Sequence, residues 1–174
     1  MRVVEKFEAP IVKAFEGFPA IPANAKETLV KAWPYLALLF AVFQVLGAYS
    51  SWNAMQLAGQ FNYYQAFTPV DRAIIYFGIV LSLVESVLLF MAFSPLQQRA
   101  KRGWDLLFLG GLLNVAYAVV SLFMTGYGVG SFLMGLLVAS IGFYLLVQIR
   151  EKFTGKVSRV APHRAKVAAE PKKK

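Results

Sequence analysis

Residues 106–149 read LLFLGGLLNVAYAVVSLFMTGYGVGSFLMGLLVASIGFYLLVQI and contain no charged side chain. Outside this stretch, residues 32–70 form a second run without a charge. Of the 174 residues, 58% are hydrophobic and 16% are charged, whereas about a quarter of a typical soluble domain is charged. A surface helix of a soluble protein carries polar or charged side chains along its solvent face. The two runs therefore predict an integral membrane protein.

Four segments are long and apolar enough to be membrane spans. A spanning helix needs about 20 mostly apolar residues, and each of these segments is apolar around its whole circumference. We expect an all-α polytopic protein with a four-transmembrane-helix antiparallel bundle at residues 33–150, flanked by an N-terminal segment at 1–32 and a basic tail at 151–174. The predicted spans are residues 34–55, 73–93, 106–124 and 129–149.

Local signals suggest where some helices begin and end. Thr68, Pro69 and Asp71 supply a cap, a proline at the first helical position and an acid at the third, so a helix should begin there. Pro95 should end the same helix after Ser94. Residues 24–27, which read NAKE, resemble a capping box that would start the helix leading into the first span.

The two ends of the chain differ from the spans. Apolar side chains recur three or four residues apart in the N-terminal segment, which predicts an amphipathic helix on the inner leaflet or against a partner protein; they are Val4, Phe7, Ile11, Phe15 and Phe18. The basic tail is too polar to pack and should be disordered. Its lysines and arginines suit contact with anionic lipid head groups.

The distribution of positive charge predicts the orientation. Every lysine and arginine except Arg72 falls in the N-terminal segment, in the connection between the second and third spans, or after the last span. Because positively charged loops stay in the cytoplasm, both termini should be cytoplasmic and the protein should lie in the cell (inner) membrane.

Several classes of site are excluded by composition. The chain has no cysteine and one histidine, His163, which argues against a metal site, and it has no nucleotide-binding or nucleophile motif. We therefore expect a protein that is not an enzyme and holds no cofactor and no metal. The basic tail lacks interleaved aromatic residues, which argues against nucleic acid as a partner.

One polar residue of each span lies at the same depth. Counted along the helices from the basic side, Gln44, Glu85, Asn114 and Ser140 all lie roughly 15 Å from the membrane edge. Glu85 is the only charged side chain within any predicted span. A carboxyl group at this depth is costly and marks either a functional site or a structural hydrogen bond between helices.

Two functions fit these features. The first is a structural or accessory subunit whose cytoplasmic face contacts anionic lipid, a protein partner or a second copy through basic residues, namely Arg99, Lys101, Arg102, Lys172, Lys173 and Lys174. The second is a proton-coupled small-molecule transporter that uses Glu85. The layout resembles small four-helix multidrug exporters, but their membrane glutamate lies in the first span and Glu85 lies in the second, so its role is not carried over.

A further resemblance concerns the basic edges of the spans. Residues 99–108, RAKRGWDLLF, with the span that follows, and residues 141–153, IGFYLLVQIREKF, resemble uncharacterised small four-transmembrane-helix membrane proteins of candidate-phylum (small-genome) bacteria. The resemblance covers about residues 25–153. It implies the four-helix topology and a bacterial cytoplasmic membrane, and it carries over no functional residue.

Overall fold

The structure is a computed structural model that describes residues 2–61, 67–125 and 128–153. These residues form five α-helices and a short 3-10 helix, without a strand among them, which confirms the all-α fold class. The tail expected to be disordered falls almost entirely outside the described residues. In chain order the elements are α1 (Arg2–Phe15), α2 (Ala23–Gln60), α3 (Pro69–Gln97), α4 (Lys101–Ser121), α5 (Gly128–Ile149) and η2 (Arg150–Phe153).

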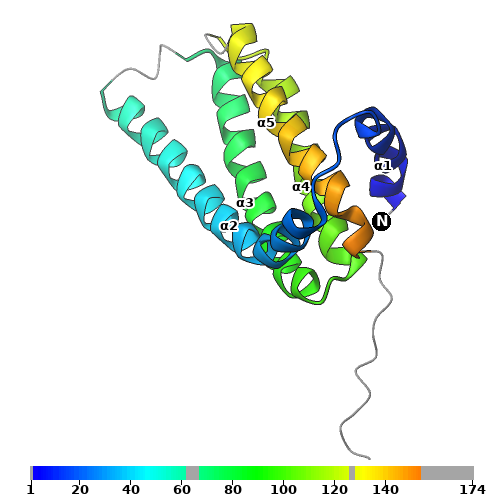
Figure 1. Ribbon diagram of the computed structural model, residues 1–174. Helices are drawn as coiled ribbons and strands as arrows, with labels where there is room; N and C mark the ends of the chain where they lie inside the picture. The colour runs from blue at the N-terminus through cyan, green and yellow to red at the C-terminus, as the bar shows by residue number, and fades with distance from the viewer. Residues whose placement is uncertain (1, 62–66, 126–127, 154–174) are drawn as a thin grey trace, which may run out of the picture.

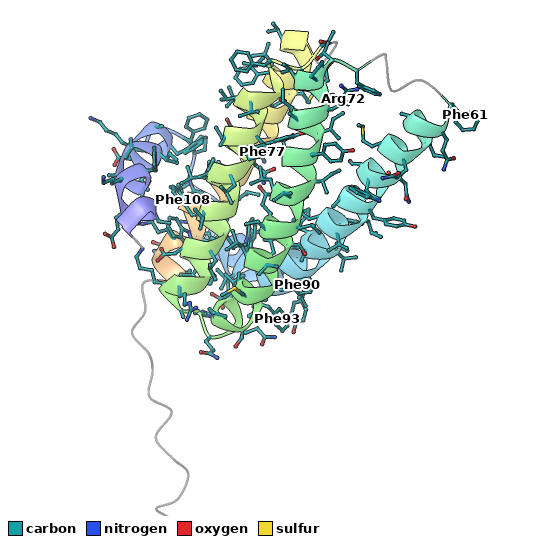
Figure 2. The ribbon with its side chains drawn as sticks, turned by 180° about the vertical axis from the view of Figure 1, so that it is seen from behind. Phe61, Arg72, Phe77, Phe90, Phe93 and Phe108 are labelled. Carbon is teal, nitrogen blue, oxygen red and sulfur yellow. The ribbon has the colours of Figure 1, made fainter. Side chains whose placement is uncertain are left out.

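Four helices are long and apolar enough to cross a membrane, as predicted: α2, α3, α4 and the helical stretch Phe132–Phe153. Their outer surfaces carry many large apolar side chains. Phe77 and Phe90 of α3, both labelled in Figure 2, are 46% and 48% exposed. Such a surface is suited to lipid, because water would be ordered around it at a free-energy cost.

The four long helices pack in chain order, α2 along α3, α3 along α4 and α4 along α5. Tyr35 and Trp52 of α2 lie with ring centroids 6.1 Å from those of Phe93 and Tyr76 of α3, respectively. Rising residue numbers on α2 thus meet falling numbers on α3. Figure 1 shows α2 leaning away from α5 toward its C-terminal end.

The predicted start of α3 is confirmed. The backbone N–H of Asp71 donates to Thr68 Oγ1 (3.1 Å), and the backbone N–H of Thr68 donates to Asp71 Oδ2 (2.8 Å), which completes a capping box. The other oxygen, Asp71 Oδ1, accepts a hydrogen bond from the backbone N–H of Thr125 (2.6 Å). This bond ties the segment after α4 to α3, and α4 ends at Ser121 instead of residue 124.

The end of α3 differs from the prediction. The helix continues through Pro95 to Gln97. Proline removes only one N–H donor from the helix, and the Pro95 carbonyl still accepts a hydrogen bond from the Ala100 N–H (2.8 Å). The chain then turns at Arg99, whose φ of 52° lies in the left-handed region. The turn is tight: a Cβ on Gly103 would lie 2.7 Å from the backbone nitrogen of Leu96.

The capping box predicted at residues 24–27 is wrong. Helix α2 begins at Ala23 after Pro22, and no side chain caps its first turn. Asn24 Oδ1 accepts from the backbone N–H of the next residue, Ala25 (2.9 Å). Glu27, which would complete the box, instead pairs with Arg99 in the turn after α3. A full ion pair to a guanidinium competes well with a single backbone N–H.

Helix α1 packs against the chain itself, along the half of α5 nearest to η2 (Figure 1). Glu8 of α1 contacts Arg150, whereas Phe15 lies beside Tyr144, with ring centroids 6.2 Å apart. The two helices therefore run in opposite directions. Val4 is fully buried in the core, and Ile11 and Phe15 pack on that core.

The face that α1 buries differs from the predicted one at two positions. Phe7, one of the predicted apolar positions, is half exposed, and Glu8, which is not among those positions, is buried. Positions 4, 8, 11 and 15 form one stripe of a helix, and position 7 lies about 100° away from position 8. Glu8 is tolerated in the stripe because two basic side chains meet it there.

Candidate functional site

A cavity of about 630 Å³ lies among the four long helices. We call it the α2–α5 groove. Among its lining residues are Phe40, Phe43 and Gln44 of α2, Glu85 of α3, Gly110 and Asn114 of α4, and Met134, Gly135, Val138 and Gly142 of α5.

The groove opens sideways between α2 and α5. Its rim on α2 is formed by Phe40 and Phe43, and its rim on α5 by Met134 and Val138. All four side chains are more than half exposed, between 52% and 62%. Helix α2 is joined to η2, which follows α5, by an ion pair between Lys26 and Glu151 (3.3 Å). Away from this ion pair, the groove opens toward the outside of the bundle.

The polar part of the groove is built on Glu85. Gln44 Nε2 donates a hydrogen bond to Glu85 Oε2, which links α2 to α3. Glu85 is only 3% exposed. Its second oxygen, Oε1, is buried and has no hydrogen-bond partner among the residues that the structure describes. A buried carboxyl oxygen without a donor is energetically unfavourable and invites a partner.

Asn114 of α4 is a further polar group beside Glu85. Its side chain lies close enough to interact with the Glu85 carboxyl group, and its Nδ2 donates to the backbone carbonyl of Gly110 (3.2 Å). The structure thus brings three of the four predicted polar residues together from three different helices.

Ser140, the fourth predicted residue, does not line the groove. Its hydroxyl donates to the carbonyl of Leu136 within α5 (2.8 Å). The α5 positions that face the groove include Gly135, Ala139 and Gly142, and Ser140 lies about 100° around the helix from Ala139. Counting residues gives the depth of a side chain in the membrane, and only the packing of the helices gives its direction.

The six basic residues predicted to contact lipid or a partner fall into three groups. Arg99 pairs with Glu27, and Lys101 donates to Asp105 (2.8 Å) and to Glu8 (3.4 Å), so both are engaged within the chain. Arg102 is exposed. Lys172, Lys173 and Lys174 lie outside the described residues.

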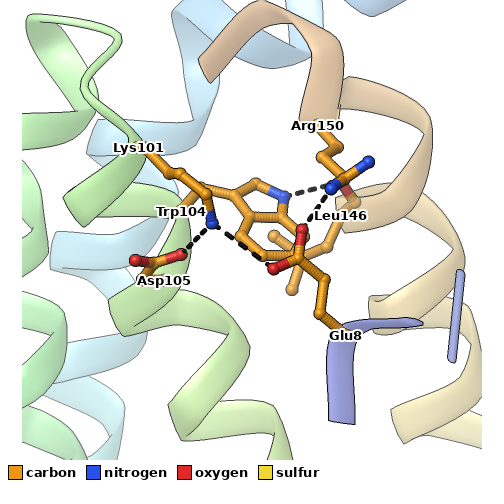
Figure 3. Close-up of polar contacts among 6 residues, drawn as sticks. All are labelled: Glu8, Lys101, Trp104, Asp105, Leu146 and Arg150. Carbon is orange, nitrogen blue, oxygen red and sulfur yellow. Dashed lines mark hydrogen bonds and ion pairs between the residues drawn. The ribbon is translucent and has the colours of Figure 1, made fainter. Parts of the chain in front are cut away.

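Figure 3 shows the charged cluster that these contacts form with α1. The Glu8 carboxylate accepts from Arg150 Nε (2.5 Å) and from Lys101 Nζ. Beneath it, Trp104 Nε1 donates to the carbonyl of Leu146 (2.8 Å), and the Trp104 ring stacks on Phe108 with centroids 5.0 Å apart. We call Glu8, Lys101, Asp105 and Arg150 the basic-end cluster.

Sequence reasoning missed the role of Glu8 and Trp104. The only available signal for Glu8 was its place in the 4–8–11–15 stripe. Trp104 follows basic residues and precedes an apolar run, which is typical of a tryptophan at the membrane surface. It is instead 1% exposed, because α5 and η2 cover it.

Comparisons with known proteins give no relative: no family model, no curated protein and no solved structure matches this chain. Within residues 2–61, 67–125 and 128–153, no three His, Cys, Asp or Glu side chains are grouped so that they could hold a metal ion.

A double-mutant cycle should detect the bond between α2 and α3. Gln44→Leu should lower the free energy of unfolding, because Glu85 loses the donor that Gln44 supplies. The double variant Gln44→Leu with Glu85→Leu should lose less unfolding free energy than the sum of the losses in the two single variants. We expect a coupling energy of roughly 0.6–2 kcal/mol. Unfolding in mixed micelles at rising SDS content measures it.

Ser140→Ala serves as the control for this cycle, because its hydroxyl bonds only within α5. Combined with Glu85→Leu, it should show no coupling. A Gln44–Glu85 coupling as small as that of the Ser140 pair would contradict the assigned hydrogen bond.

Glu8→Gln should loosen α1 from the bundle. The variant removes the negative charge of Glu8, which pairs with Arg150 and Lys101. Because both basic partners are nearly half exposed, the free energy that holds α1 against the bundle should fall by about 1.5 kcal/mol. A single cysteine at the fully buried position Val4 reports the detachment. Its maleimide labelling should become about tenfold faster in Glu8→Gln.

Glu16→Gln is the matched control for this test, since Glu16 is exposed in the turn that directly follows α1. Its labelling rate should equal that of the parent. Equal rates in all three proteins would mean that the basic-end cluster does not hold α1.

Proposed function

We propose that this chain is a non-enzymatic integral membrane protein, a structural or accessory subunit that holds a transmembrane helix of a partner protein in the α2–α5 groove. The observation that carries the proposal is the sideways opening of the groove, with an incompletely bonded carboxyl group at its base. The surrounding surface is apolar and contacts the bilayer, so the natural occupant is another membrane component.

The shape of the groove favours a helix over a small molecule. Sites for small ligands enclose most of the ligand surface, whereas both rims of this groove are exposed along α2 and α5. A helix lying in the opening would cover both rims at once. A Cβ on Gly142, which is only partly buried, would meet nothing within 4 Å, so a second backbone can approach closely there, as small residues permit in membrane helix pairs.

The basic end of the bundle supports a second part of the proposal. We place it in the cytoplasm, with both chain termini, in the inner membrane of a bacterium; the charge distribution and the resemblance of residues 99–108 and 141–153 support this placement. Arg102 and the tail lysines would then meet anionic lipid head groups. Arg99 and Lys101 serve the internal ion pairs instead.

Single cysteines test this orientation, because the chain has none of its own. In intact cells, an impermeant maleimide should label Phe61→Cys, at the far end of α2, and should leave Arg102→Cys unlabelled until the membrane is permeabilised. The reverse pattern would invert the proposed topology.

A photo-crosslinking amino acid placed on the groove rims tests the subunit role. Introduced at Phe43 or at Val138 in the native membrane, it should yield adducts with one and the same protein, identified by mass spectrometry. Val80 of α3 is the control: it is 59% exposed and does not line the groove. It should give lipid adducts only.

Lipid adducts alone from both rims would contradict the subunit role and favour the second candidate, a proton-coupled small-molecule transporter. The observation in its favour is the volume of the groove, which lies within the range of small-ligand sites. In that case Glu85→Gln, which cannot titrate, should abolish coupled flux in reconstituted vesicles.

A further inference from the structure

We infer that the helix accommodated by the α2–α5 groove carries a lysine or arginine near the middle of the membrane, and that this side chain donates to Oε1 of Glu85. The inference rests on the proposed function, since it names the chemistry of the partner at the same site. It starts from the unequal surroundings of the two Glu85 oxygens: Oε2 accepts from Gln44, and Oε1 is buried without a partner among the described residues.

The spans of this chain offer Oε1 no basic side chain. Residues 34–55, 73–93, 106–124 and 129–149 contain no lysine or arginine. The two amides beside Glu85, those of Gln44 and Asn114, carry no positive charge; Asn114 also donates from Nδ2 to the carbonyl of Gly110. A charged donor for Oε1 must therefore come from outside the chain.

The depth of Glu85 excludes lipid head groups as that donor. Glu85 lies 10 residues before Pro95 and 14 residues after Asp71, which is roughly 15 Å and 21 Å along α3. Head groups lie at the two surfaces of a hydrocarbon layer about 30 Å thick. A side chain in the middle of another transmembrane helix lies at the depth of Glu85 and can reach it without deforming the bilayer.

Charge complementarity selects a basic residue on that helix. A carboxylate that is removed from water is stabilised best by a hydrogen-bonded cation, and unpaired ionisable groups within membranes are rare. A second copy of this chain could enter the groove, but its spans would bring no lysine or arginine. A different protein is therefore the occupant that completes the site.

Model transmembrane peptides test this chemistry without knowledge of the natural partner. Two alanine–leucine helices of about 20 residues, one with a central lysine and one with a central leucine, are added to the full chain in phosphatidylcholine vesicles. Energy transfer from a dye on Phe61→Cys to a dye on the peptide reports binding. The lysine peptide should bind about tenfold more tightly than the leucine peptide.

Three further variants in the same labelled background show where the peptide binds. In Glu85→Gln the advantage of the lysine peptide should disappear. In Gly142→Leu the new side chain fills open space in the groove, so both peptides should bind more weakly. Gly47→Leu is the matched control: its Cβ also meets nothing within 4 Å, and Gly47 does not line the groove, so binding should not change.

The outcomes separate the inference from the proposed function. Equal binding of the two peptides, weakened by Gly142→Leu, would overturn the basic partner and leave helix docking in place. If neither peptide binds the parent chain more tightly than it binds Gly142→Leu, both the basic partner and helix docking in the groove are overturned. Energy transfer between two labelled copies of the chain, abolished by Gly142→Leu, would replace the basic partner with a second copy. Circular dichroism of every variant verifies that its helices are intact.

Discussion

The interior of a bilayer supplies no hydrogen-bonding partners, and this constraint accounts for most of the architecture. Backbone groups in the spans must be bonded within their own segment, which permits helices. Side chains that remain polar must find partners within the protein: Gln44 bonds Glu85, and Asp71 holds both the start of α3 and the segment after α4. Among the side chains that the structure describes, Glu85 Oε1 is the exception, and for that reason it is the most informative atom of the groove.

The basic end of the bundle is organised by different forces. Here the basic side chains are partly exposed, and ion pairs join segments that are far apart in the chain. Glu8 anchors α1 to α4 and η2, while Trp104 fills the core beneath the cluster and bonds the backbone of α5 (Figure 3). This end is the closed part of the bundle. The groove opens beyond it, where α2 leans away from α5.

The division into a closed end and an open groove links fold to function. Packing along α3 keeps Gln44 and Glu85 in register, while the small residues of α4 and α5 leave space beside them. A bundle closed along its full length would bury the carboxyl group with no access from the membrane. In the open arrangement the cavity that Glu85 lines is bordered by exposed side chains of α2 and α5, which is the basis of the role proposed for this chain.

The sequence by itself determined the four apolar helices and the capped start of α3 at Thr68, because these depend on composition and on capping residues that are close together in the chain. The tertiary structure decided the direction of each side chain. It turned Ser140 away from Glu85, brought Glu8 inward and buried Trp104. In a span that is apolar on every side, no periodic pattern marks the face that meets a neighbour, so the rotation of each helix is set by packing alone.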